Sequence, residues 1–102
     1  MSNKHRITAA DELNPGECME TVVDGRILAV YNVDGQFHAL DGICPHAGGP
    51  LGKGTLQGRT VTCPWHGWQF DVETGQHCLN AEIEQKRYEV AVVGGDLVVD
   101  FD

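Results

Sequence analysis

Short runs rich in apolar and β-branched residues, separated by turn residues, predict antiparallel β-structure in the first half of the chain. Three of them cover residues 18–23, 26–32 and 36–40, and the pairs Asp24-Gly25 and Asp34-Gly35 separate them. Asp-Gly favours a tight hairpin turn because glycine tolerates a positive φ angle. The pattern therefore predicts a three-stranded meander.

Alternation of apolar and polar residues marks a second β region near the end of the sequence. It covers residues 88–92 and 97–101, on either side of Gly94-Gly95, and predicts a second hairpin. Residues 80–85 have a helix-like composition but are too few to hold a helix without packing, so we expect a loop or a single turn there. The predicted fold class is all-β.

The least strand-like part of the chain lies between these regions, from residue 42 to residue 75, and is rich in Gly, Pro, His and Trp. Loops commonly carry function while sheets hold them rigid. We expect one domain over residues 1–102, with a site-bearing subdomain over about 42–75.

Charge narrows the range of partners. The 102 residues carry a formal net charge of −8, which disfavours nucleic acid and anionic membranes, since both attract clustered Lys and Arg. The acidity fits a basic protein partner, or simply solubility. No apolar stretch has the length of a membrane span, and the polar start has no signal-peptide core, so the expected location is the cytoplasm.

Two short motifs combine cysteine with histidine: Cys44-Pro45-His46 and, after sixteen intervening residues, Cys63-Pro64-Trp65-His66. Thiolate and imidazole ligands suit zinc or a mixed-ligand iron-sulfur centre. Zinc sites usually pair Cys with Cys and His with His, whereas each motif here contributes one of each. In a mixed-ligand [2Fe-2S] cluster one iron takes both cysteines and the other takes both histidines, which this spacing supplies. Zinc on the same four ligands stays as an alternative.

Together with Gly67 and the following Trp68-Gln69-Phe70-Asp71, the two motifs resemble those of the Rieske family. The resemblance implies an antiparallel β-sandwich with a cluster-binding subdomain formed by two loops. It also implies that Cys44 and Cys63 bind the inner iron of one [2Fe-2S] cluster. By the same resemblance His46 and His66 bind the outer iron.

The resemblance also indicates a low reduction potential. High-potential Rieske proteins add a cysteine pair that bridges the loops, and a Ser and a Tyr that donate hydrogen bonds to the cluster. The corresponding positions here are Gly49 and Trp65 for the bridge, and Trp68 and Phe70 for the donors. Without these donors negative charge on sulfur is less stabilised, so we expect a potential near the low end of the Rieske range, roughly −150 to +300 mV.

Residues beside the ligands have predicted supporting roles. Glycines such as Gly49 let backbone N–H groups approach cluster sulfur, and Pro50 stiffens the covering loop. We expect Trp68 to shield the cluster, while Trp65 fits either shielding or a partner surface.

The remaining cysteines and histidines have simpler predicted roles. For Cys18 and Cys78 we favour a buried thiol or a surface bystander over a second metal pair. The other histidines are expected to be structural or surface residues: His5, His38 and His77.

The resemblance implies an electron carrier between a flavin-dependent reductase and a terminal oxygenase, without enzymatic activity of its own. A second hypothesis is the small subunit of a cytoplasmic NAD(P)H nitrite reductase, attached to its large subunit. A third, from another class, is a zinc-binding interaction module.

Overall fold

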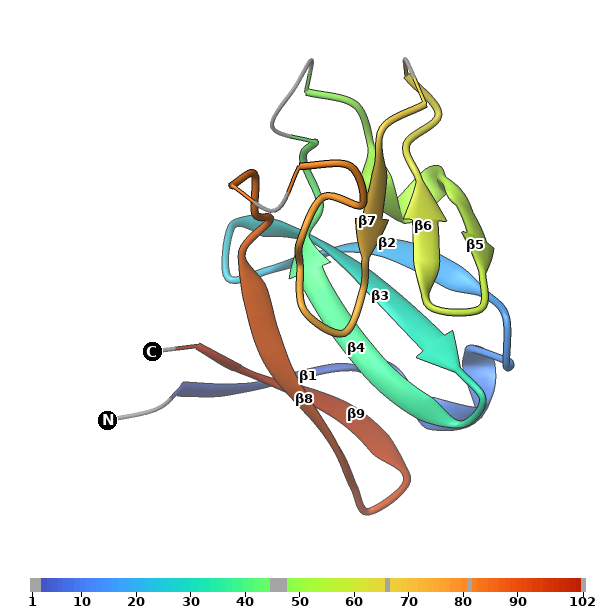
Figure 1. The fold of residues 1–102 in the computed structure, drawn as a ribbon. Coiled ribbons are helices and arrows are strands. Elements are labelled where there is room, and N and C mark those ends of the chain that lie inside the picture. The colour runs from blue at the N-terminus through green and yellow to red at the C-terminus, as the bar shows by residue number, and fades with distance from the viewer. Residues whose placement is uncertain (1–2, 45–47, 66, 81, 102) are drawn as a thin grey trace.

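The computed structural model describes residues 3–44, 48–65, 67–80 and 82–101. These residues form two antiparallel sheets, of six and three strands, and the prediction of an all-β fold is confirmed (Figure 1). The strands are β1 Asn3–Ala9, β2 Cys18–Val23, β3 Arg26–Val33, β4 Gln36–Asp41, β5 Thr55–Gln57, β6 Thr60–Thr62, β7 Gln69–Asp71, β8 Arg87–Val93 and β9 Asp96–Phe101. None of the helices in these ranges has the length and apolarity that crossing a membrane requires.

The predicted meander and second hairpin are both present. β2, β3 and β4 pair in sequence order, and β8 pairs with β9. In the β2–β3 turn, Asp24 and Gly25 have φ angles of 51° and 77°, the left-handed pair that a tight turn between twisted strands requires. The Asp-Gly signal therefore located the turns correctly.

The six-stranded sheet has the order β1-β9-β8-β4-β3-β2 and folds over on itself. One half contains β1, β9 and β8, and the other contains the meander, joined where β4 pairs with β8 over two residue pairs. The two halves enclose a first core. Its buried members are Leu13, Val23, Leu28, Val30, Ala39, Tyr88, Leu97 and Val99.

The opposite face of the meander carries the small sheet, in the order β5-β6-β7. A second core lies between them and includes two of the predicted ligands, Cys44 and Cys63. The other buried members are Ala29, Tyr31, Leu40, Leu51, Val61, Phe70 and Val72. The antiparallel sandwich and a separate loop-bearing subdomain are thus both observed.

Some elements were not predicted. Residues 42–75, expected to be loop, contain all three strands of the small sheet and the 3₁₀ helix η2, Leu51–Lys53. Three-residue strands are too short to show a clear alternation. β1 is mostly polar and is set by pairing with β9, and the 3₁₀ helix η1, Ala10–Glu12, follows it.

Candidate metal centre

Two loops leave the same end of the molecule, one after β4 and the other between β6 and β7 (Figure 1). The same backbone hydrogen bond closes both. The Cys44 N–H donates to the Gly49 carbonyl at 2.9 Å, and the Cys63 N–H donates to the Trp68 carbonyl at 2.8 Å. Each cysteine is therefore fixed at the first position of a closed loop, five residues before its partner.

The two cysteines are buried side by side. Cys44 is 1% exposed and Cys63 is 2% exposed, and both belong to the second core. Burial raises the pKa of the Cys63 thiol, the Trp65 backbone N–H lowers it through a hydrogen bond, and the neighbouring Cys44 side chain raises it again. Ionising two adjacent buried thiols is costly when no positive charge is nearby. A metal ion that binds both as thiolates supplies that positive charge.

Gly49 makes room for these thiols. A Cβ atom at this position would lie 2.8 Å from the Cys63 Sγ and 3.0 Å from the Trp65 Cβ. The absent side chain thus lets the first loop pass over the sulfur of the second. Pro50 follows, pairs with Ile43 through an isolated bridge and caps η2.

The two predicted histidine ligands, His46 and His66, lie outside the described residues. Among the described residues there is no cluster of three or more metal-binding side chains. The flanking glycines are described: Gly48 and Gly67 have φ angles of 75° and 73°, which favour glycine.

The aromatic residues around the cysteines differ in exposure. Phe70 is fully buried, and Trp68 is partly buried against the second core. His77 lies edge-on to both rings, with centroids 4.7 Å from Trp68 and 5.3 Å from Phe70. Trp65 is 50% exposed. The position of Trp68 suits the predicted shielding, whereas Trp65 presents apolar surface to solvent.

Gln85, a residue that the sequence analysis did not single out, braces the first loop. Its buried side-chain Nε2 donates to the carbonyls of Asp41 (2.7 Å) and Ile43 (2.5 Å), immediately before Cys44. Its backbone N–H donates to the Gly75 carbonyl. A glutamine in a loop far along the chain carries no pattern that would reveal these contacts.

The remaining cysteines stand apart from the two loops. Cys18 is partly buried, and its thiol donates to the Gly54 carbonyl at 3.3 Å. Cys78 is exposed. Neither joins a metal-binding cluster within the described ranges.

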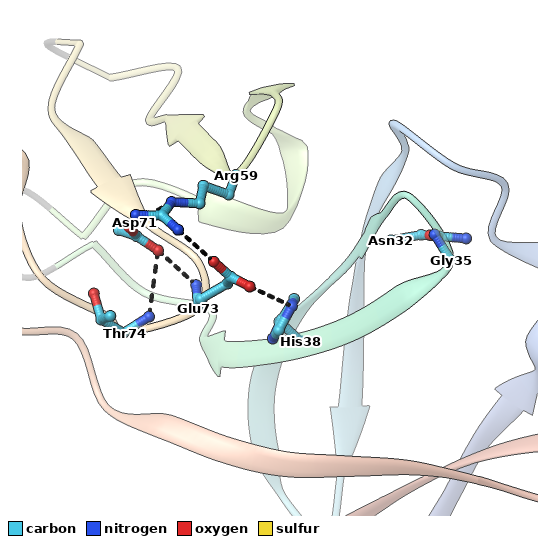
Figure 2. A network of polar contacts seen from close by, with 7 residues as sticks. All are labelled: Asn32, Gly35, His38, Arg59, Asp71, Glu73 and Thr74. Atoms are coloured by element: carbon cyan, nitrogen blue, oxygen red, sulfur yellow. Dashed lines mark hydrogen bonds and ion pairs between the residues drawn. The ribbon is translucent and has the colours of Figure 1, made fainter.

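A polar network anchors the small sheet to the meander (Figure 2). Arg59 pairs with Asp71 at 3.1 Å and with Glu73 at 2.9 Å, and Glu73 lies 3.8 Å from His38 on β4. The Asp71 carboxylate also accepts the N–H groups of Glu73 and Thr74. These contacts join β4, the β5–β6 turn and the end of β7, so His38 has the structural role expected of it.

Comparison with known proteins decides between the two kinds of metal site. The model of the Rieske [2Fe-2S] domain matches residues 3–92. The chain belongs to the Rieske [2Fe-2S] family. The Rieske cofactor is one [2Fe-2S] cluster, as predicted, and the zinc-binding module loses its support.

Individual Rieske relatives cover nearly the whole chain. The ferredoxin component of the naphthalene 1,2-dioxygenase system of Pseudomonas aeruginosa is 36% identical, with 87% of this chain and 86% of the relative covered. A chain in the solved complex of reduced oxygenase and oxidized ferredoxin in carbazole 1,9a-dioxygenase matches with a TM-score of 0.86 and 34% identity, covering 94% and 91% of the two chains.

A third match concerns the fold alone. The putative NADH-dependent nitrite reductase small subunit from Mycobacterium tuberculosis has a TM-score of 0.91 at 23% identity, covering 100% of this chain and 97% of that chain.

Proposed function

We propose that this chain is a low-potential one-electron carrier that takes electrons from a flavin-dependent reductase and delivers them to a terminal oxygenase. The observation that carries the proposal is the pair of buried, adjacent thiols of Cys44 and Cys63 at the start of two matched loops, in a Rieske chain whose relatives are named as ferredoxin components of dioxygenase systems.

The proposed ligands are Cys44 and Cys63 for one iron and His46 and His66 for the other, within the subdomain of residues 42–75 of a single domain. The donor set suits the cluster because each loop supplies one sulfur and one nitrogen. A bound cluster would supply one-electron redox chemistry. The chain itself supplies the closed loops, the space beside Gly49 and the second core that excludes water from the thiolates.

The surface around the loops supports docking at this end of the molecule. Ile43 and Trp65, which flank the two cysteines, are 47% and 50% exposed, and Leu79 is 91% exposed. Leu79 lines a hollow of about 400 Å³ together with Gly67 and Trp68. Exposed apolar side chains beside a redox centre favour a short-lived contact with a protein partner.

The charge of −8 complements a basic docking face, and electron delivery would then slow as salt screens the attraction. The cytoplasm is the location that fits four free cysteines in a chain of this size. A reduced flavin holds two electrons, so one flavin reduces two molecules of this carrier.

Reduction and reoxidation of the intact holoprotein test the proposal. Reductase and oxygenase fractions are prepared from the same cells. NADH with the reductase fraction is expected to bleach the visible absorption of the holoprotein, and the oxygenase fraction with its substrate and O₂ is expected to restore it. Isolation of the chain as a fixed subunit of a sirohaem protein would instead support the nitrite reductase hypothesis.

A further inference from the structure

Tyr31 carries a buried hydroxyl group without a partner. The side chain is 0% exposed, in the middle of β3, and its Oη has no hydrogen-bond partner among the described residues. A buried hydroxyl left unpaired destabilises the folded protein, and phenylalanine would fill the same space without that cost. The hydroxyl therefore has no acceptor among the described residues and is available to one that forms when a cofactor binds.

Three sulfur atoms lie in the surroundings of Tyr31, and two of them, those of Cys18 and Cys63, are near enough to raise the pKa of its phenol. Tyr31 is paired with Cys18 across β2 and β3, so their side chains lie on the same face of the meander. That face packs on the second core, which contains Tyr31 together with Cys44 and Cys63. Burial raises the pKa of Tyr31, and the nearby Cys18 and Cys63 raise it further. A phenol is in any case protonated at neutral pH and able to donate.

We propose that the Tyr31 hydroxyl donates a hydrogen bond to the Cys63 thiolate in the cluster-loaded protein and thereby raises the reduction potential. This inference rests on the proposed role of Cys63 as an iron ligand. Metal binding turns Cys63 into a thiolate, and a hydrogen bond to a charged acceptor is roughly twice as strong as one to a neutral acceptor.

Cys18 is the weaker acceptor of the two. Its thiol already donates to the Gly54 carbonyl. Burial and the nearby Glu17 raise its pKa, so it remains a neutral thiol. A neutral sulfur is a weak acceptor, whereas the thiolate of a cluster ligand gains negative charge when the cluster is reduced. A donor to that thiolate stabilises the reduced state more than the oxidised state.

The test is the midpoint potential of the holoprotein by protein-film voltammetry, for the wild type and for Tyr31→Phe. We expect Tyr31→Phe to lower the potential, with up to a tenfold smaller ratio of reduced to oxidised protein at a fixed electrode potential, equivalent to about 59 mV for one electron. Tyr88→Phe, in the first core, is the matched control and should leave the potential unchanged. An unchanged potential in Tyr31→Phe overturns the inference.

Cys18→Ala separates the two acceptors. If it lowers the potential as much as Tyr31→Phe, the hydroxyl acts through Cys18 and the inference is wrong. A full cluster content in the Cys63→Ser variant would refute the proposed ligand set instead. Cluster content, measured with and without Cys63→Ser, therefore distinguishes the two failures.

A second measurement keeps the Tyr31 hydroxyl and changes its strength as a hydrogen-bond donor. The chain has two tyrosines, so in the Tyr88→Phe background 3-fluorotyrosine enters at position 31 alone. The fluorinated phenol is a stronger donor and should raise the potential. A potential that stays the same or falls contradicts the inference, even if Tyr31→Phe fails to hold its cluster.

Discussion

Gly49 in the first loop lies directly against Cys63 in the second loop, so the two loops pack together at this contact. A Cβ atom on Gly49 would sit 2.8 Å from the Cys63 Sγ, a separation that real side chains do not adopt. The φ angle of Gly49 is outside the left-handed region. The requirement for glycine is therefore one of space beside the sulfur and not one of backbone conformation.

Replacing Gly49 with alanine should disrupt the site. We expect Gly49→Ala to destabilise the protein by about 1–3 kcal/mol, the usual effect of overpacking, and to lower the iron bound per chain. Gly16→Ala is the contrast, because Gly16 has a φ of 86° and no atom near the added Cβ. It should cost stability without altering the visible spectrum. Full iron content and an unaltered spectrum in Gly49→Ala would contradict this account.

Gln85 should affect how firmly the protein retains its cluster, although it lies far from Cys44 in the sequence. Gln85→Leu removes the donors to the carbonyls of Asp41 and Ile43 and leaves them unpaired, at a cost of about 1–3 kcal/mol. We expect faster loss of the visible absorption in a chelator. Gln57→Leu, on the exposed side of β5, is the matched control. Equal rates of loss in the two variants would show that Gln85 does not brace the loop.

Phe70 tests the explanation of the low potential. It is fully buried and stands where high-potential Rieske proteins are expected to carry a hydroxyl donor. Phe70→Tyr should therefore raise the midpoint potential of the holoprotein. The wild-type value is expected well below about +100 mV within the Rieske range of roughly −150 to +300 mV. A higher wild-type value, or a fall in Phe70→Tyr, would count against the explanation.

Cys18 should respond to alkaline pH. Its native pKa lies above the ordinary value of 9.0, because burial and then Glu17 disfavour the thiolate. The folded state thus holds this proton more tightly than the unfolded state. The associated stability is present below about pH 9 and is lost as the pH rises through the native pKa. In Cys78→Ser holoprotein, the rate of iodoacetamide labelling of Cys18, followed by mass spectrometry, should still rise with pH beyond pH 9.0 and not level off there. Rapid labelling at pH 8 would contradict this.

The parts of the fold that could be predicted depend on local signals. Asp24-Gly25 marks a turn because both residues adopt positive φ angles there, and the Cys-x-His and Cys-x-x-His spacings mark the loops. The small sheet gave no comparable signal, since its three-residue strands are fixed by pairing with one another and by the core beneath them.

The sequence predicts a set of four ligands but not the packing around them. Gly49 could be assigned a close approach of the backbone, but its contact with Cys63 depends on how two distant loops pack. Tyr31 and Gln85 lie in ordinary β and loop sequence. Their importance arises from an unpaired hydroxyl and a pair of side-chain hydrogen bonds, which are visible only in three dimensions.

Pulsed electron paramagnetic resonance of the dithionite-reduced holoprotein tests whether two cysteines and two histidines hold a [2Fe-2S] cluster. The protein is labelled with ¹⁵N-histidine. We expect hyperfine couplings from two histidine nitrogens, with one lost in His46→Ser and in His66→Ser wherever the cluster survives. A reduced-cluster signal without histidine coupling, or a diamagnetic protein containing zinc and no acid-labile sulfide, would contradict the account.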